Sequence, residues 1–189
     1  MRCTVVVLVA LVGCSEFETA GAPGGVQPVD AAAPVPDARV MDAIDRQMIR
    51  EAERLGTFTR VNRISYPSTV GTFSIDVFVN QDGRSYRRIH HETTGSGVVV
   101  PVGTMVVRNV LDAQGAITKV TLMAKQTAGY DPTLGDWWFG VTDPAGNPLD
   151  DGAGPQVGRL TECHGCHLPR AQDDFLFGVP QDAQRPGGP

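Results

Sequence analysis

The spacing of hydrophobic and polar residues changes once along this chain, at Gly56. Between residues 38 and 55 apolar side chains recur every three or four positions, and Gly56 follows directly. This spacing predicts an amphipathic helix that ends at the glycine. The apolar stripe consists of Met41, Ile44, Met48, Ala52 and Leu55. The opposite face, which we expect in solvent, carries Asp42, Arg46, Arg50 and Glu51.

Beyond Gly56 the apolar residues alternate with polar ones, which is typical of strands. The predicted strands are residues 58–64, 73–79, 104–111, 117–125 and 136–142. A turn signal at residues 112–115 joins the third strand to the fourth as an antiparallel hairpin. Residues 85–91 are ambiguous and permit a helical turn, and residues 157–166 predict a short helix. The expected fold is α+β, a mostly antiparallel β-sheet with an N-terminal helix and a short C-terminal helix.

The N-terminus predicts export and lipid attachment. Residues 1–13 combine a short basic start with an apolar run too short to span a bilayer, as in a signal peptide. The run ends in Leu11-Val12-Gly13-Cys14, which resembles the lipobox of bacterial lipoproteins and makes Cys14 the lipidation candidate. The alternative is an ordinary signal peptide with a chance cysteine. Because Ser15 rather than aspartate follows, we expect an extracytoplasmic, lipid-anchored protein on the outer membrane, facing the periplasm.

Composition divides the rest of the chain into a tether, one domain and a tail. Residues 14–38 contain the candidate lipidated cysteine and an Ala/Pro/Gly-rich segment without helical or strand periodicity, which we interpret as a disordered tether. Residues 39–180 have the length of one ordinary domain, and residues 181–189 are a flexible tail. The net charge of −5 gives no sign of nucleic-acid binding. We expect membrane contact through the lipid anchor only.

Near the C-terminus, Cys163-His164-Gly165-Cys166-His167 has the pattern C-x-x-C-H, the attachment signature of c-type haem. It predicts one covalently attached haem c, with thioethers at Cys163 and Cys166 and with His167 as the proximal iron ligand. His164 lies between the anchored cysteines and is held away from the iron. The alternatives are a zinc site, completed by His90 or His91, and a redox dithiol. Neither has its usual sequence context here, a second C-x-x-C or a βαβ unit.

The sixth iron position has no outstanding candidate. The available side chains are His90, His91, Met105 and Met123. Each has an ordinary structural explanation, so we predict an open, five-coordinate iron.

A tryptophan-rich strand is placed to wall the distal pocket. It contains Trp137, Trp138 and Phe139. Alternation along a strand puts Trp137 and Phe139 on one face and Trp138 on the other. Core packing is the ordinary role for at least one of these sets.

The order of these elements resembles the cytochrome P-460 family, over roughly residues 40–178. The resemblance is carried by the haem motif together with Gly103-Thr104-Met105-Val106-Val107-Arg108, Gly129-Tyr130-Asp131-Pro132, Gly135-Asp136-Trp137-Trp138-Phe139 and Asp174-Phe175-Leu176-Phe177. It implies a single-haem periplasmic protein with an antiparallel sheet and an open iron. Family members known for chemistry oxidise hydroxylamine with a lysine bonded to the porphyrin.

Arg108 stands where that lysine is expected. A guanidinium is protonated and delocalised, so it is a poor nucleophile for such a bond. Three roles stay open for Arg108: contact with a haem propionate, a hydrogen bond to a distal ligand, or exposure to solvent from an edge strand. Alternation places it with Val106 and Val110, which favours the haem. Lys125, on the neighbouring strand, is not expected to supply the amine instead.

Two functional classes follow. The first is a haem protein that binds or converts small nitrogen ligands such as nitric oxide or hydroxylamine, with a redox partner protein. The candidate activity in that class is hydroxylamine or nitric oxide oxidoreductase, but the missing lysine argues against standard hydroxylamine oxidation. The second class is an electron-transfer cytochrome with a filled sixth site. No catalytic residue is assigned, and Arg108 is the distal or propionate-contacting candidate.

Overall fold

A computed structural model describes residues 39–69, 71–81 and 83–185. The signal peptide, Cys14 and the tether predicted from the sequence lie outside these residues, and so does the end of the predicted tail. For them the sequence interpretation stays a prediction.

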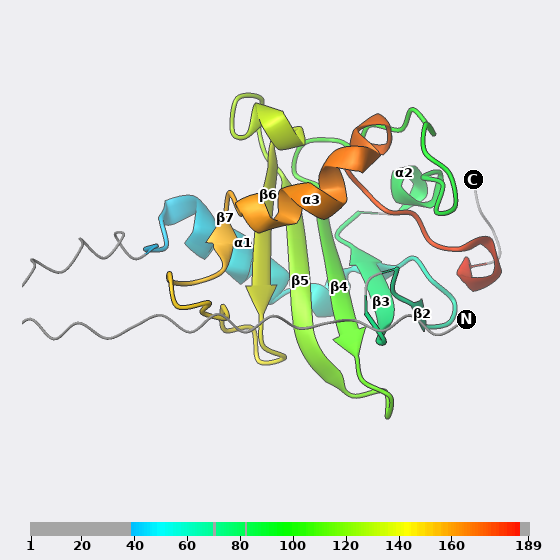
Figure 1. Ribbon diagram of the computed structural model, residues 1–189, viewed down its shortest axis with the longest axis horizontal. Coiled ribbons are helices and arrows are strands. Elements are labelled where there is room, and N and C mark those ends of the chain that lie inside the picture. The colour runs from blue at the N-terminus through cyan, green and yellow to red at the C-terminus, as the bar shows by residue number, and fades with distance from the viewer. Residues whose placement is uncertain (1–38, 70, 82, 186–189) are drawn as a thin grey trace, which may run out of the picture. The chain divides into compact units, whose positions relative to one another are not determined.

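A seven-stranded, entirely antiparallel sheet forms the centre of the domain (Figure 1). Its strands are β1 (Thr59–Arg60), β2 (Tyr66–Pro67), β3 (Ser74–Val79), β4 (Met105–Leu111), β5 (Ile117–Lys125), β6 (Trp137–Thr142) and β7 (Val157–Gly158). They follow the order β1-β3-β4-β5-β6-β7, and β2 also pairs with β3. The predicted hairpin is present as β4 and β5. The α+β fold class predicted from the sequence is confirmed.

The helices are α1 (Ala43–Ala52), α2 (Arg84–Arg87) and α3 (His164–His167). Short 3-10 helices are Leu55–Thr57, Pro132–Leu134, Thr161–Cys163, Leu168–Asp173 and Gln181–Ala183. In Figure 1, α1 lies behind the sheet and α3 crosses its front, so the two cover opposite faces. Among the helices of the described residues, none has the length and apolar character that a membrane span requires.

Strand alternation divides the core into a back layer and a front layer. Behind the sheet, the apolar stripe of α1 packs around Trp138, whose indole Nε1 donates to the buried Asp45 carboxylate at 2.8 Å. The front layer contains Val106, Trp137 and Phe139 and packs against Cys163. The predicted division of the tryptophan-rich strand into opposite faces is therefore confirmed.

The structure departs from the predicted boundaries at four places. Helix α1 begins later, after Asp42, which forms a capping box with Asp45. Only two residues of the predicted strand 58–64 pair as β1. Val157 does not begin the C-terminal helix, because Gly158 has a φ of 98° and both residues pair with β6. Residues 181–185 pack on the domain through the buried Ala183, so its described part extends past the boundary expected at residue 180.

Candidate functional site

The C-x-x-C-H motif occupies one tight helical segment. Cys163 ends a 3-10 helix, and α3 continues directly through Cys166 to His167. Residues three apart in a helical turn lie on the same face, so both thiols face the same side. Both are free thiols, Cys163 half-buried against the front core and Cys166 exposed. The spacing of the motif thus presents two sulfur atoms and an imidazole on one short surface.

A cavity lies between this segment and the front of the sheet. Its empty volume is about 1020 Å³, part of it open to solvent. Cys163, Cys166 and His167 all border on it, and we call it the motif cavity. Its apolar walls include Phe73, Ile75, Val106, Val110, Met123 and Leu176.

His167 has its ring orientation determined by a backbone group. Its Nδ1 lies 2.7 Å from the carbonyl oxygen of Phe175. Since a carbonyl only accepts, Nδ1 must donate, which leaves the Nε2 lone pair free. The rings of Phe139 and Phe177 each pack edge-on against the imidazole, with centroids 5.4 Å away. Metal-ligating histidines typically make such a hydrogen bond through the ring nitrogen that does not bind the metal.

Burial favours the neutral form of the His167 imidazole. Burial lowers the pKa of His167 below its ordinary value; the hydrogen bond to Phe175 acts in the opposite direction, and the nearby charge of Arg108 lowers the pKa further. A neutral imidazole can coordinate a metal, whereas an imidazolium cannot.

The Phe175 carbonyl owes its position to an unusual backbone. Asp174 and Phe175 have left-handed φ values of 53° and 62°, each of which costs about 1–3 kcal/mol. Asp174 is held from three sides: its carboxylate accepts from Lys125 Nζ and from the Val100 amide at 2.9 Å, and its carbonyl accepts from the Trp137 indole at 2.8 Å. These bonds hold the strained segment and direct the next carbonyl toward His167.

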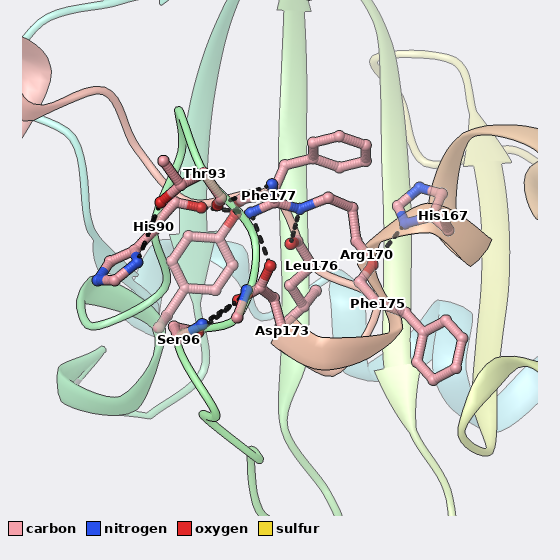
Figure 2. A network of polar contacts seen from close by, with 11 residues as sticks. His90, Thr93, Ser96, His167, Arg170, Asp173, Phe175, Leu176 and Phe177 are labelled. Carbon is pink, nitrogen blue, oxygen red and sulfur yellow. Dashed lines mark hydrogen bonds and ion pairs between the residues drawn. The ribbon is translucent and has the colours of Figure 1, made fainter.

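Arg170 ties the segment after the motif to a distant loop (Figure 2). Its guanidinium donates to the carbonyl oxygens of Leu176 at 3.2 Å, Thr93 at 3.0 Å and His90. It also forms an ion pair with Asp173 at 3.1 Å. A buried arginine with this many acceptors is satisfied and serves to position the backbone.

Asp173 completes this connection. Its Oδ1 accepts from the Gly95 amide at 3.1 Å, the Ser96 amide at 2.7 Å and the Ser96 hydroxyl at 2.6 Å. Burial by itself would raise the pKa of Asp173, but the hydrogen bonds from Ser96 and the charge of Arg170 outweigh it and lower the pKa. The loop clamped in this way carries His91 to the motif cavity.

Arg108 lies inside the sheet and borders on the motif cavity together with Val106 and Val110. β4 pairs with β3 on one side and β5 on the other, so the suggestion that Arg108 points to solvent from an edge strand is wrong. Its Nε is buried and has no hydrogen-bond partner among the described residues. A buried donor without a partner is costly, and at the wall of a cavity it is available to an acceptor placed there.

The candidates for a sixth iron ligand separate into two groups. His91 and Met123 border on the motif cavity. His90 is exposed, with Nδ1 3.3 Å from the Thr93 hydroxyl, and Met105 is buried behind the sheet. The structure therefore does not bring His90 or Met105 to the motif.

The tryptophans are absent from the walls of the motif cavity, although the sequence placed them near it. Trp137 is engaged with Asp174, and Trp138 faces the back core. Of the three aromatic residues only Phe139 reaches the motif, through His167. Trp137 and Trp138 therefore pack in the core and do not wall the motif cavity.

Lys119, Tyr66 and Phe73 border on the motif cavity and were not identified from the sequence. Lys119 could have been found, because it lies two and four residues from Thr121 and Met123 on one face of β5. Phe73 could also have been found, because it alternates with Ile75 in the predicted strand 73–79. Tyr66 had no such signal, since β2 is too short to show alternation. Lys125 has its ammonium on Asp174 and does not border on the cavity.

The alternatives for the two cysteines lack support in the described residues. No group of three or more His, Cys, Asp or Glu side chains there is arranged to hold a metal ion such as zinc. Burial raises the pKa of Cys163 to about 12, whereas a redox dithiol needs a thiol of lowered pKa. His164 Nε2 lies 3.9 Å from the Asp131 carboxylate, and His164 does not border on the motif cavity.

No model of a known protein family matches the chain, and no curated protein matches it.

Proposed function

We propose that this protein is a membrane-anchored, extracytoplasmic mono-haem c-type cytochrome of the cytochrome P-460 type, which binds or converts small nitrogen ligands such as nitric oxide or hydroxylamine. Cys163 and Cys166 form the thioethers, and His167 is the proximal ligand. The bound haem would supply a redox-active iron that coordinates the small ligand. The protein residues hold that haem, exclude water around it and select the ligand.

One observation carries this proposal: the Nδ1 of His167 donates to the Phe175 carbonyl while the same residue borders on a cavity shared with both thiols. This leaves Nε2 free for iron beside the two sulfur atoms that would anchor the ring. A pair of free cysteines on a surface without a cavity would not explain why the imidazole is oriented in this way.

The remaining cavity residues fit a haem. The walls offer apolar and aromatic side chains for the flat faces of the macrocycle, such as Phe73 and Val106. The partnerless Nε of Arg108 offers a buried cation for an anionic acceptor, either a propionate or an iron-bound ligand.

The chemistry at the iron is expected to differ from lysine-cross-linked relatives of the family. Arg108 occupies the expected lysine position, and Lys125 is engaged with Asp174. We therefore propose a haem without a lysine bond, and ligand binding rather than standard hydroxylamine oxidation. Electrons would pass to or from a redox partner protein.

Intact-protein mass spectrometry and optical spectra test this proposal. The full chain, made in a bacterium that attaches c-type haem, should carry one covalent haem, and Cys163→Ser/Cys166→Ser should carry none. The reduced protein should bind carbon monoxide promptly. A wild-type chain that stays free of haem in a host that loads another c-type cytochrome would refute the proposal.

The electron-transfer alternative draws support from His91 and Met123, since both border on the motif cavity. It predicts a low-spin spectrum that carbon monoxide does not change. In that case His91→Ala or Met123→Ala should create a carbon monoxide-binding form and so identify the sixth ligand.

A further inference from the structure

Two cations in the motif cavity, Arg108 and Lys119, have no carboxylate partner among the described residues. Several other cations with little exposed side chain are paired, Lys125 with Asp174, Arg170 with Asp173 and Arg60 with Asp76, while the half-buried Arg87 has no carboxylate partner among the described residues. Arg108 has a buried Nε without an acceptor among the described residues, and the Lys119 ammonium lies 5.9 Å from the centre of the Phe73 ring. Cations removed from water are normally paired, so two half-buried cations at the wall of one cavity are available to anionic partners from outside the chain.

The only carboxylate that borders on the motif cavity in the described part of the chain does not neutralise them. It belongs to Glu162, whose side chain is 51% exposed and lies 3.6 Å from the guanidinium of Arg39. Tyr66 and His91 also border on the cavity, but they bring no negative charge at neutral pH, because burial raises the pKa of the Tyr66 phenol. The cavity thus retains an excess of positive charge.

The strand register orders the two cations relative to the motif. Phe139, which contacts His167, pairs with Met123 on β5. Along the same face, Arg108 lies at the level of Thr121 and Lys119 pairs with Val110. With a rise of about 3.4 Å per residue, these levels are about 7 and about 14 Å from that of Met123. Arg108 is therefore at an intermediate level, and Lys119 is at the far end.

The positions of the substituents on a c-type haem can be compared with these levels. Its two thioether-forming vinyl groups and its two propionates lie on opposite edges of the ring. With the cysteines holding one edge, the propionates would point away from the motif. Lys119, half-buried at the far end, matches the propionate edge. Of the two cations, Arg108 lies at the level nearer to Met123 and hence to His167, so it would be the one nearer to the iron.

We propose that Arg108 is the cation that faces the iron-bound ligand, that Lys119 serves a propionate, and that the site prefers ligands carrying negative charge, such as nitrite or azide. This inference rests on the proposed haem function. A guanidinium at a water-poor cavity forms strong, charge-assisted hydrogen bonds with an anion. A neutral diatomic ligand gains much less from the same contact.

Ligand titrations of the haem-loaded full chain test the inference, with azide for the ferric protein and carbon monoxide for the ferrous protein. Arg108→Gln should weaken azide binding about tenfold or more, and change carbon monoxide binding by less than about threefold. Arg108→Lys, which keeps the charge but loses the planar fork, should give an intermediate azide affinity. Arg88→Gln removes the same charge from an exposed site outside the cavity and serves as the matched control, with unchanged affinities.

Several results would overturn the inference while leaving haem attachment intact. The first is an equal loss of azide and carbon monoxide affinity in Arg108→Gln, which would indicate a merely structural role. The second is a loss of azide affinity in Lys119→Gln as large as that in Arg108→Gln. The third is failure of Arg108→Gln to load haem while Lys119→Gln loads it fully, because Arg108 would then serve the haem itself. Absence of haem in the wild type contradicts the proposed function instead.

Discussion

The ion pair between Lys125 and Asp174 gives the sharpest test of how the fold supports the candidate site. The two side chains are only 11% and 5% exposed, and the Lys125 ammonium also lies 5.2 Å from the centre of a Trp137 ring. Lys125→Met removes the cation and keeps an apolar side chain of similar length. The Asp174 carboxylate is then left in the core with the Val100 amide as its donor.

The expected loss follows from this burial. Removing one partner of a buried ion pair costs about 3–5 kcal/mol, because the other charge stays buried without compensation. The remaining hydrogen bond from Val100 places Lys125→Met at the lower end, about 3 kcal/mol. For a domain of this size each kcal/mol lowers Tm by about 2–4 °C, so we expect a decrease of about 6–12 °C.

Urea unfolding of the haem-loaded protein measures this free energy, and an exposed cation outside the motif cavity offers a control. Arg88→Met replaces a cation by the same apolar side chain at the surface, and should cost less than about 1 kcal/mol. Asp174→Asn combined with Lys125→Met leaves no buried charge. The double variant should therefore lose less stability than the two single variants together, by about 0.5–3 kcal/mol.

Two outcomes would refute this reasoning. If Lys125→Met and Arg88→Met unfold at the same urea concentration, the buried pair does not stabilise the domain. If the two single substitutions at Lys125 and Asp174 are additive, the side chains do not interact as the structure has them.

Two further predictions concern the same region. The pKa of Asp173 is lowered in the folded protein. Its contribution to stability is therefore present above the unfolded pKa of about 3.9 and is lost as the pH falls through the folded pKa. In urea unfolding between pH 6 and 3, the free energy of unfolding should decline less steeply for Asp173→Asn than for the wild type. Gly135 and Gly115 both have positive φ, but a Cβ at Gly135 would lie 2.5 Å from the Phe175 ring, whereas one at Gly115 meets no atom within 4 Å. Gly135→Ala should therefore destabilise the domain by about 1–3 kcal/mol more than Gly115→Ala, and equal losses would show that the Phe175 ring moves aside freely.

Periodicity predicted the elements with repeated apolar positions. The alternation in β3, β4, β5 and β6 and the stripe of α1 are strong signals, because each element buries one face against a core. β2 and β7 consist of two residues each, and so they carry no period that a sequence could display. Their pairing is decided by the strands beside them.

The motif and the position of Arg108 on an inward face could also be read from the sequence. Cys163, Cys166 and His167 are close along the chain, so their spacing alone brings them together. The choice between His91 and His90 could not be read in this way. It depends on how Arg170 and Asp173 clamp a loop about 77–80 residues away in the sequence.

The sequence by itself determined the sheet, the motif and the replacement of the expected lysine by Arg108, because all of these depend on local spacing or on single residues. Only the tertiary structure decided that the Phe175 carbonyl orients His167 and that Lys119, rather than Lys125, borders on the motif cavity. Those facts depend on strand register and on buried hydrogen bonds between distant segments, such as those of Asp174. Such bonds form only where packing brings the segments together, and local spacing does not encode them.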